Sequence, residues 1–114
     1  MNYKLYQIHL TEAEHNQVNA EGHNSVPKHR LKLDMSFNEN VAELAKEAMD
    51  KGYYTHVSNI EADSLEGVFE VGNIGPESAI TRLAKMYSVS VADVVETPEG
   101  VRHVVASIGF QQLA

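Results

Sequence analysis

The sequence predicts an α+β domain over residues 1–114, with an antiparallel sheet of about four strands and three or four helices packed mostly on one face. Stretches in which apolar and polar residues alternate, as in strands, are interleaved with stretches whose apolar residues recur every three or four positions, as in helices. Near the C-terminus, two strand-like runs flank the turn sequence TPEG at residues 97–100. We therefore expect the chain to end in a β-hairpin.

The N-terminal third is predicted to contain a strand, a short helix and a long loop. Residues 3–10 alternate in polarity and are rich in tyrosine, which favours a strand. Thr11 and Glu14 have the spacing of a capping box, so a short polar helix is expected behind them. Residues 19–30 mix Gly, Asn, Ser, Pro and His without a period and are predicted to form a flexible loop, and residues 31–35 a short strand.

The middle of the chain predicts three helices and one strand. A second capping-box spacing begins at Ser36, and the apolar stripe behind it predicts a helix over residues 38–50. Residues 53–62 are rich in aromatic and β-branched residues and are expected to form a strand, followed by a short helix from Leu65. Pro76 is typical of a first helical position and predicts one more helix. The apolar stripe of this last helix would consist of Ala79, Ile80, Leu83, Ala84 and Tyr87.

The C-terminal hairpin is predicted to begin with a capped turn. Ser90 and Asp93 lie three residues apart, and we expect the serine hydroxyl to cap the amides of a tight turn there. The returning strand is expected to run from residue 101 to Phe110, with Gly109 as a bulge or a point of close approach.

Two segments of the chain, separated by a short gap, resemble the YodL-like domain family. They are YYTHVSNIEADSLEGVFEVGN and MYSVSVADVVETPEGVRHVVASIGFQQL. The resemblance covers residues 53–113, and the opening strand is also similar. The matching positions are Leu65, Glu66, Phe69, Asn73, Ser88, Ser90, Val91, Asp93, Val94, Gly109 and Phe110. The chain departs from the family at Ala92, where many members have glycine. The resemblance implies a small α+β module of phages, plasmids and other mobile elements, without established catalytic chemistry.

Composition narrows the classes of function. The chain has no cysteine, which removes disulfides, thiolate catalysis and Cys-ligated metal sites and suits a cytoplasmic location. No segment approaches the ~18 consecutive apolar residues of a membrane helix. The net charge of −7 arises entirely from residues 35–114, which hold five Lys or Arg and twelve Asp or Glu. This acidic balance argues against a nucleic-acid partner, because such binding depends on Lys and Arg at phosphates.

The acidic excess suggests a protein partner with a basic surface. Acidic side chains at steps of three and four residues would form a stripe opposite the apolar face of the helix over residues 38–50. The candidate partner-binding residues are Glu39, Glu43, Glu47 and Asp50, together with Tyr53 and Tyr54. A solvated helix face that serves only solubility is the simpler explanation of the stripe. We expect a non-enzymatic interaction module that modulates a host protein on behalf of a phage or mobile element.

The alternative function is a nucleotide-binding or nucleic-acid-binding accessory protein. It would use the locally basic segment PKHRLK at residues 27–32 and the exposed rings of Tyr53 or Tyr54 as a stacking surface. A solvated loop also accounts for so short a basic cluster.

Enzyme, cofactor and metal sites are not predicted. The first four histidines match no zinc-ligand spacing, whereas His56 and His103 lie on strands that we expect to be neighbours. A serine mechanism would need a base such as His103 and an acid such as Asp93 beside a serine, and no G-x-S-x-G elbow is present. The candidate serines are Ser88, Ser90 and Ser107. Capping and surface roles explain these residues without catalysis.

Overall fold

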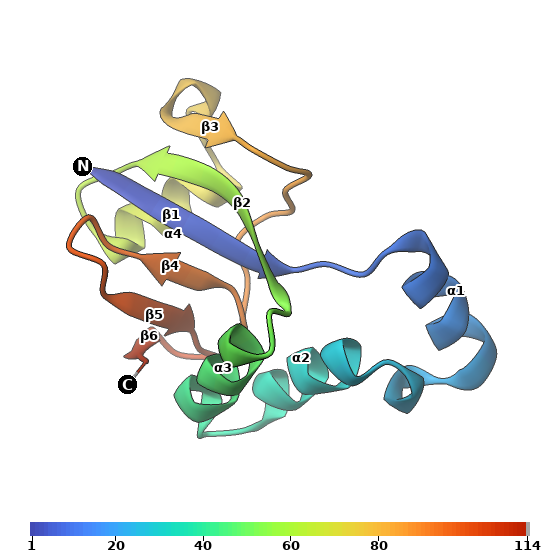
Figure 1. Cartoon of the computed structure of the whole chain (residues 1–114). Coiled ribbons are helices and arrows are strands. Elements are labelled where there is room, and N and C mark those ends of the chain that lie inside the picture. The colour runs from blue at the N-terminus through green and yellow to red at the C-terminus, as the bar shows by residue number, and fades with distance from the viewer. Residues whose placement is uncertain (114) are drawn as a thin grey trace.

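A computed structural model describes residues 1–113 and contains a six-stranded antiparallel sheet with strand order β3-β2-β1-β4-β5-β6 (Figure 1). The strands are β1 (Asn2–Ile8), β2 (Tyr54–Glu61), β3 (Ile80–Arg82), β4 (Val94–Glu96), β5 (Arg102–Val105) and β6 (Phe110–Gln112). The helices are α1 (Glu12–Glu21), α2 (Pro27–Phe37), α3 (Val41–Asp50) and α4 (Leu65–Asn73), with 3₁₀ turns η1 (His23–Ser25) and η2 (Glu77–Ala79). The α+β class, the antiparallel sheet and the four helices are confirmed, whereas the expected number of about four strands is wrong.

Helices cover both faces of the sheet, which corrects the expectation that they pack mostly on one. On one face, Leu31 and Met35 of α2 and Ala45 of α3 pack against Ile8 of β1. The other face is covered by α4 (Figure 1), whose Val68 packs in a second cluster. This second cluster contains Tyr3, Leu5, Val57, Ile60, Val89, Val95 and Val105. The core is therefore divided into two layers by the sheet.

Strand β1 is central because it pairs with β2 on one side and with β4 on the other. Leu5 belongs to the α4-side cluster and Ile8 to the α2/α3-side cluster, as the two-residue period of a strand requires. A register shift between Leu5 and Tyr6 marks a bulge in the β1–β2 pair. The predicted strands over residues 3–10 and 53–62 are confirmed, with ends that differ by one or two residues.

The N-terminal third contains more helix than the sequence predicted. The capping box is confirmed, because the Glu14 amide donates to the Thr11 hydroxyl at 3.1 Å and the Thr11 amide donates to the Glu14 carboxylate at 2.8 Å. The predicted loop over residues 19–30 is wrong, because α1, η1 and α2 occupy most of it. Figure 1 shows α1 lying away from the sheet, and none of its residues is buried.

Helix α2 replaces the strand predicted over residues 31–35. Pro27 stands at its first turn, where the missing amide costs nothing. Leu31 and Met35 are four residues apart and both are buried, as one face of a helix allows, whereas Leu33, which would share their face in a strand, is only half-buried. Ser36 lies inside α2, so the second predicted capping box does not form.

Helix α3 confirms the apolar stripe predicted for residues 38–50, although it starts later. Val41, Ala45 and Ala48 are buried on one face of the helix. Gly52 has a φ of +72° and follows the helix as the expected left-handed residue.

The helix predicted after Pro76 is absent, because this segment instead completes the sheet. Turn η2 leads directly into β3, where Ile80 pairs with Ile60 of β2. Leu83 and Tyr87, expected in a buried stripe, are half exposed or more. Ladder hydrogen bonds to β2 therefore prevail over the local helix signal, and residues 83–93 form an irregular connection to β4.

The hairpin predicted around residues 97–100 is confirmed as the β4–β5 pair. The Thr97 amide donates to the Val101 carbonyl at 2.8 Å, and Gly100 has a φ of +88°. The returning strand ends at Val105, earlier than expected, because a second turn follows in which Gly109 has a φ of +68°. This turn over residues 106–109 reverses the chain into β6, which the sequence did not predict.

Helix α4 touches the irregular connection so closely that a methyl group does not fit between them. A Cβ added to Gly72 would lie 2.3 Å from Cγ2 of Val89.

We expect Gly72→Ala to destabilise the protein by about 1–3 kcal/mol, although alanine is ordinarily favoured in helices. Urea unfolding of Gly72→Ala in the wild-type and the Val89→Ala backgrounds tests this. In the Val89→Ala background the substitution should cost less than about 1 kcal/mol; an equal cost in both would show that Val89 is not the cause.

Candidate functional site

The predicted acidic stripe lies on the solvent side of α3 and just before it. Glu39, Glu43, Glu47 and Asp50 are all exposed. In the C-terminal half of α3, Lys51 pairs with Glu47 at 3.4 Å and Lys46 pairs with Asp50 at 3.2 Å. Among the described residues, Glu39 and Glu43 form no ion pair. The unbalanced charge is therefore concentrated at the N-terminal end of the stripe.

Tyr53 and Tyr54 are both half-buried, which corrects the expectation that their rings are exposed. The Tyr54 hydroxyl donates to the Ala92 carbonyl at 2.6 Å. Burial, together with the nearby charge of Asp93, raises the pKa of the Tyr54 hydroxyl far above its ordinary value. Tyr53 packs beside the α2/α3-side cluster, with the Lys51 ammonium 5.9 Å from the centre of its ring. These rings support the core and do not form a stacking platform.

The motif residues Ser90 and Asp93 cap a turn, but with the roles reversed from those expected. The Ser90 amide donates to Oδ2 of Asp93 at 3.0 Å, and the Asp93 amide donates to the Ser90 carbonyl at 3.1 Å. The aspartate side chain is thus the capping group. Ala92 between them has a φ of +83°, in the region that glycine favours.

Gln7 is the residue that sequence reasoning missed. Its Nε2 donates to Oδ2 of Asp93 at 3.0 Å and to the Tyr87 carbonyl at 2.9 Å, while its Oε1 accepts from the Tyr87 amide at 3.0 Å. The signal was present in the sequence, since Gln7 falls on the same side of the first strand as Leu5. A polar residue on an apolar strand face indicates an internal hydrogen-bond site.

Asp93 is a buried carboxyl whose ionisation is opposed by its surroundings. Burial raises its pKa to about 7, although the hydrogen bonds from Ser90 and Gln7 favour the charged form. A carboxyl with such a pKa is a candidate acid or base. Here its oxygen accepts from Gln7 and from the Ser90 amide inside the fold, so the geometry indicates a structural role.

The residues considered for catalysis are not brought together. The candidate serines Ser88, Ser90 and Ser107 are exposed, whereas Asp93 is buried. His103 lies on β5, and its buried Nδ1 has no hydrogen-bond partner among the described residues. Within residues 1–113 no hydrogen bond joins a candidate serine hydroxyl to His103, so no nucleophile–base pair is formed.

The six histidines are dispersed. The prediction that His56 and His103 lie on neighbouring strands is wrong, because β1 and β4 separate β2 from β5. His56 instead stacks on Tyr6, with ring centres 5.0 Å apart. His23 and His29 form a pair whose ring nitrogens are 3.1 Å apart. Across residues 1–113, no three His, Asp or Glu side chains gather in an arrangement that would hold a metal ion.

The basic segment at residues 27–32 is engaged within the molecule. It forms the first half of α2, where Lys28 pairs with Glu14 at 2.8 Å and Lys32 donates to the Ile8 carbonyl at 3.3 Å. Lys28 therefore links α2 to α1, and Lys32 links α2 to β1. With Tyr54 half-buried as well, the geometry does not favour the nucleic-acid alternative.

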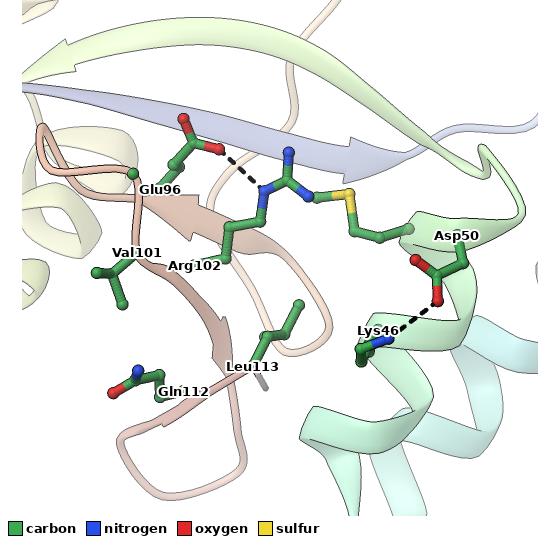
Figure 2. A pocket seen from close by; sticks show the side chains of 9 residues that line it. Lys46, Asp50, Glu96, Val101, Arg102, Gln112 and Leu113 are labelled. Carbon is green, nitrogen blue, oxygen red and sulfur yellow. Dashed lines mark hydrogen bonds and ion pairs between the residues drawn. The ribbon is translucent and has the colours of Figure 1, made fainter.

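A cavity of about 440 Å³ lies between α3 and the β4–β5 hairpin. Figure 2 shows the side chains that line it. Its charged side chains are paired, Lys46 with Asp50 at 3.2 Å and Arg102 with Glu96 at 2.9 Å. Burial disfavours ionised Glu96, but the hydrogen bond and charge of Arg102 outweigh it and hold the pKa of Glu96 below its ordinary value. A charged ligand would have to displace one of these pairs, so the cavity is a weak candidate for a binding site.

A more distinctive feature is an apolar surface around the turn over residues 106–109. Ile108 and Phe37 lie there. Their side chains are 92% and 89% exposed, which makes them the two most exposed large apolar side chains among the described residues. Both line a cavity of about 390 Å³, here called the α2 pocket. A cavity of about 260 Å³, the α4 pocket, lies beside Phe69, which is 42% exposed.

The two pockets share Ala106 and Ser107, so they form one continuous surface. We define the edge surface as Phe37, Phe69, Ala106, Ser107 and Ile108. The motif residues Gly109 and Phe110 lie in the wall of the α4 pocket. Gly109 forms the turn, and Phe110 is half-buried against the α4-side cluster.

Each pocket carries one carboxylate at its rim, Glu39 in the α2 pocket and Glu66 in the α4 pocket. Among the described residues that line either pocket there is no Lys, Arg or His, and neither glutamate forms an ion pair. The edge surface therefore exposes large apolar side chains among uncharged polar ones such as Ser36 and Asn38, and it is negative at its margin. Of the residues that line the two pockets, Glu39 alone was a partner-binding candidate from the sequence, because sequence alone does not show which apolar residues the fold leaves outside.

Asp93 should make the stability of the protein depend on pH. An aspartate in an unfolded chain ionises at about pH 4, whereas Asp93 in the folded protein releases its proton at about pH 7. Between these values the folded state binds more protons, so this contribution to stability falls as pH rises and is constant above pH 7. Asp93→Asn keeps an acceptor oxygen without the charge. We expect its stability relative to wild type to increase by about 3 kcal/mol from pH 4.5 to 7.5.

Urea unfolding of both proteins at the two pH values measures this difference. Asp34→Asn, at an exposed position of α2, is the matched control and should follow wild type at both. A difference between Asp93→Asn and wild type that does not change with pH would contradict the buried, protonated carboxyl.

Searches against models of protein families, curated proteins and solved structures found no match to this chain. The resemblance to the YodL-like family therefore remains a prediction from the residues that carry it. Within residues 1–113, no helix combines the length and the apolar character needed to cross a membrane. The function has to be inferred from the geometry of the surface.

Proposed function

We propose that this chain is a non-enzymatic protein–protein interaction module that binds its partner through the edge surface. The observation that carries the proposal is the gathering of Ile108, Phe37 and Phe69 around one turn between two pockets. Apolar side chains in water cost free energy in proportion to their exposed area. A contiguous apolar surface with a polar rim is typical of a protein interface.

The charge of the rim supports a partner with a basic surface. Glu39 and Glu66 stand beside the apolar centre, and Glu43 follows on the first turn of α3. Opposite charge across an interface accelerates encounter and excludes partners of the wrong sign. In keeping with the YodL-like resemblance, we propose that the partner is a host protein in the cytoplasm and that a phage or mobile element encodes the chain.

The absence of an assembled chemical site supports a non-enzymatic role. Within the described residues, the buried carboxyl of Asp93 is bonded to Gln7 and Ser90, and the charges of the cavity in Figure 2 are paired. Neither place combines a nucleophile, a base and open space, which catalysis requires together.

Ile108→Asp should abolish binding without affecting the fold. The side chain is exposed in the free protein, so the substitution is expected to change stability by no more than about 0.5 kcal/mol. In a complex it would place a charge against apolar groups of the partner, and we expect at least about a tenfold loss of captured protein. The measurement is capture of partners from a nuclease-treated bacterial lysate at low and high salt, with mass spectrometry.

Leu83→Asp is the matched control, because Leu83 is also exposed but follows β3 at the opposite edge of the sheet. It should capture the same partner as wild type. If Ile108→Asp and wild type retain the same proteins in the same amounts, the edge surface is not the interface. Material that is lost on nuclease treatment would instead indicate a nucleic-acid ligand.

A further inference from the structure

The edge surface borders an open strand edge. Strand β6 is the last strand of the sheet and pairs only with β5. The Leu113 amide donates to the Arg102 carbonyl and the Ala106 amide to the Gly109 carbonyl, both at 2.9 Å. Along an antiparallel ladder, residues that bond to the neighbouring strand alternate with residues that do not. Gln111 lies two residues from both Leu113 and Gly109, so its main chain also bonds to β5. The main-chain N–H and C=O groups of Phe110 and Gln112 therefore face outward.

The two pockets lie on opposite faces of this edge. Phe110 lines the α4 pocket, whereas Gln111, the next residue, lines the α2 pocket. The Gln111 side chain reaches the start of α3, accepting from the Ala42 amide and donating to the Glu39 carbonyl, both at 3.3 Å. Successive side chains of a strand point to opposite faces. A strand added beside β6 would therefore direct alternate side chains toward the two pockets.

Both pockets suit the same kind of side chain. Each combines an aromatic ring with an unpaired carboxylate, Phe37 with Glu39 in the α2 pocket and Phe69 with Glu66 in the α4 pocket. Lys and Arg side chains have long apolar stems that pack on apolar surfaces and charged ends that reach a carboxylate. An apolar or basic side chain can thus occupy either pocket, and an acidic one is repelled from both.

We propose, building on the proposed function, that the partner binds through an extended basic segment that pairs with β6 as a seventh strand and places alternate apolar or basic side chains in the two pockets. An added strand satisfies the outward groups of Phe110 and Gln112. A helix would leave these groups without partners and would present side chains to one pocket only. A second copy of the chain is disfavoured, because it would bring a surface with the same negative rim against this one.

The first test separates strand addition from other modes of binding. A displayed library of random 12-residue peptides is selected on the wild-type protein, and enriched peptides are synthesised and titrated calorimetrically. We expect them to be rich in Lys, Arg and β-branched residues. Gln112→Pro removes an amide that faces outward, a position where edge strands accept proline. It should weaken peptide binding at least about tenfold, because it removes a hydrogen bond and obstructs the approaching strand.

Gln112→Ala is the matched control and should bind within about threefold of wild type, because it retains the amide. Circular dichroism and thermal unfolding of both variants establish that the fold is retained. If both bind equally while Ile108→Asp does not, the edge surface binds by another mode and strand addition is wrong. If Ile108→Asp also binds equally, the proposed function fails as well.

The second test concerns charge. Replacing Glu39 and Glu66 together by Gln should weaken binding of the selected peptides about tenfold at low salt and reduce its salt dependence. Glu99→Gln, at the exposed turn between β4 and β5, is the control and should have little effect. Selection of acidic peptides, of peptides with a helical period, or of none would overturn the proposal. Concentration-dependent dimerisation of wild type that Gln112→Pro abolishes would identify a second copy as the occupant and also overturn it.

Discussion

The side-chain amide of Gln7 is the contact on which the arrangement of the sheet depends. Residues 83–93 connect β3 to β4 without regular structure, so much of their main chain has no partner in a ladder. Gln7 bonds both the amide and the carbonyl of Tyr87, as a neighbouring strand would, and also holds Asp93. Because Gln7 is buried in the central strand, this connection is fixed to the middle of the sheet. The start of β4 follows from it, and β5 and β6 are added in turn beyond β4.

The turn before β4 is held from both faces of the sheet. On one side Asp93 binds the Ser90 amide and Gln7, and on the other the Tyr54 hydroxyl binds the Ala92 carbonyl. The Ala92 amide also donates to the Val105 carbonyl at 2.9 Å. These bonds offset the conformational cost of the positive φ at Ala92 and the cost of burying the Asp93 carboxyl. The motif that resembles the YodL-like family is therefore a determinant of the fold in this chain.

Local signals were sufficient wherever an element depends on a few consecutive residues. The Thr11 cap, the stripe of α3 and the turn at residues 97–100 were predicted because their hydrogen bonds or the spacing of their apolar residues lie within one segment. The loop and the strand predicted over residues 19–35 were wrong because the helix that begins at Pro27 was not recognised. Other errors occurred where a distant partner decides, as when β2 draws residues 80–82 into the sheet. The same reason limited the site, since burial of neighbouring residues determines that Phe37 remains outside while Met35 does not.

The shortness of β6 limits what its exposed edge can bind. A three-residue strand offers outward main-chain groups from only two residues, too few to hold another chain by ladder bonds alone. Binding then requires the pockets on both faces to be filled at the same time. The carboxylates at their rims repel other copies of this acidic chain. In the proposed mode of binding, the charge that disfavours a second copy is thus also the charge that favours a basic, extended partner.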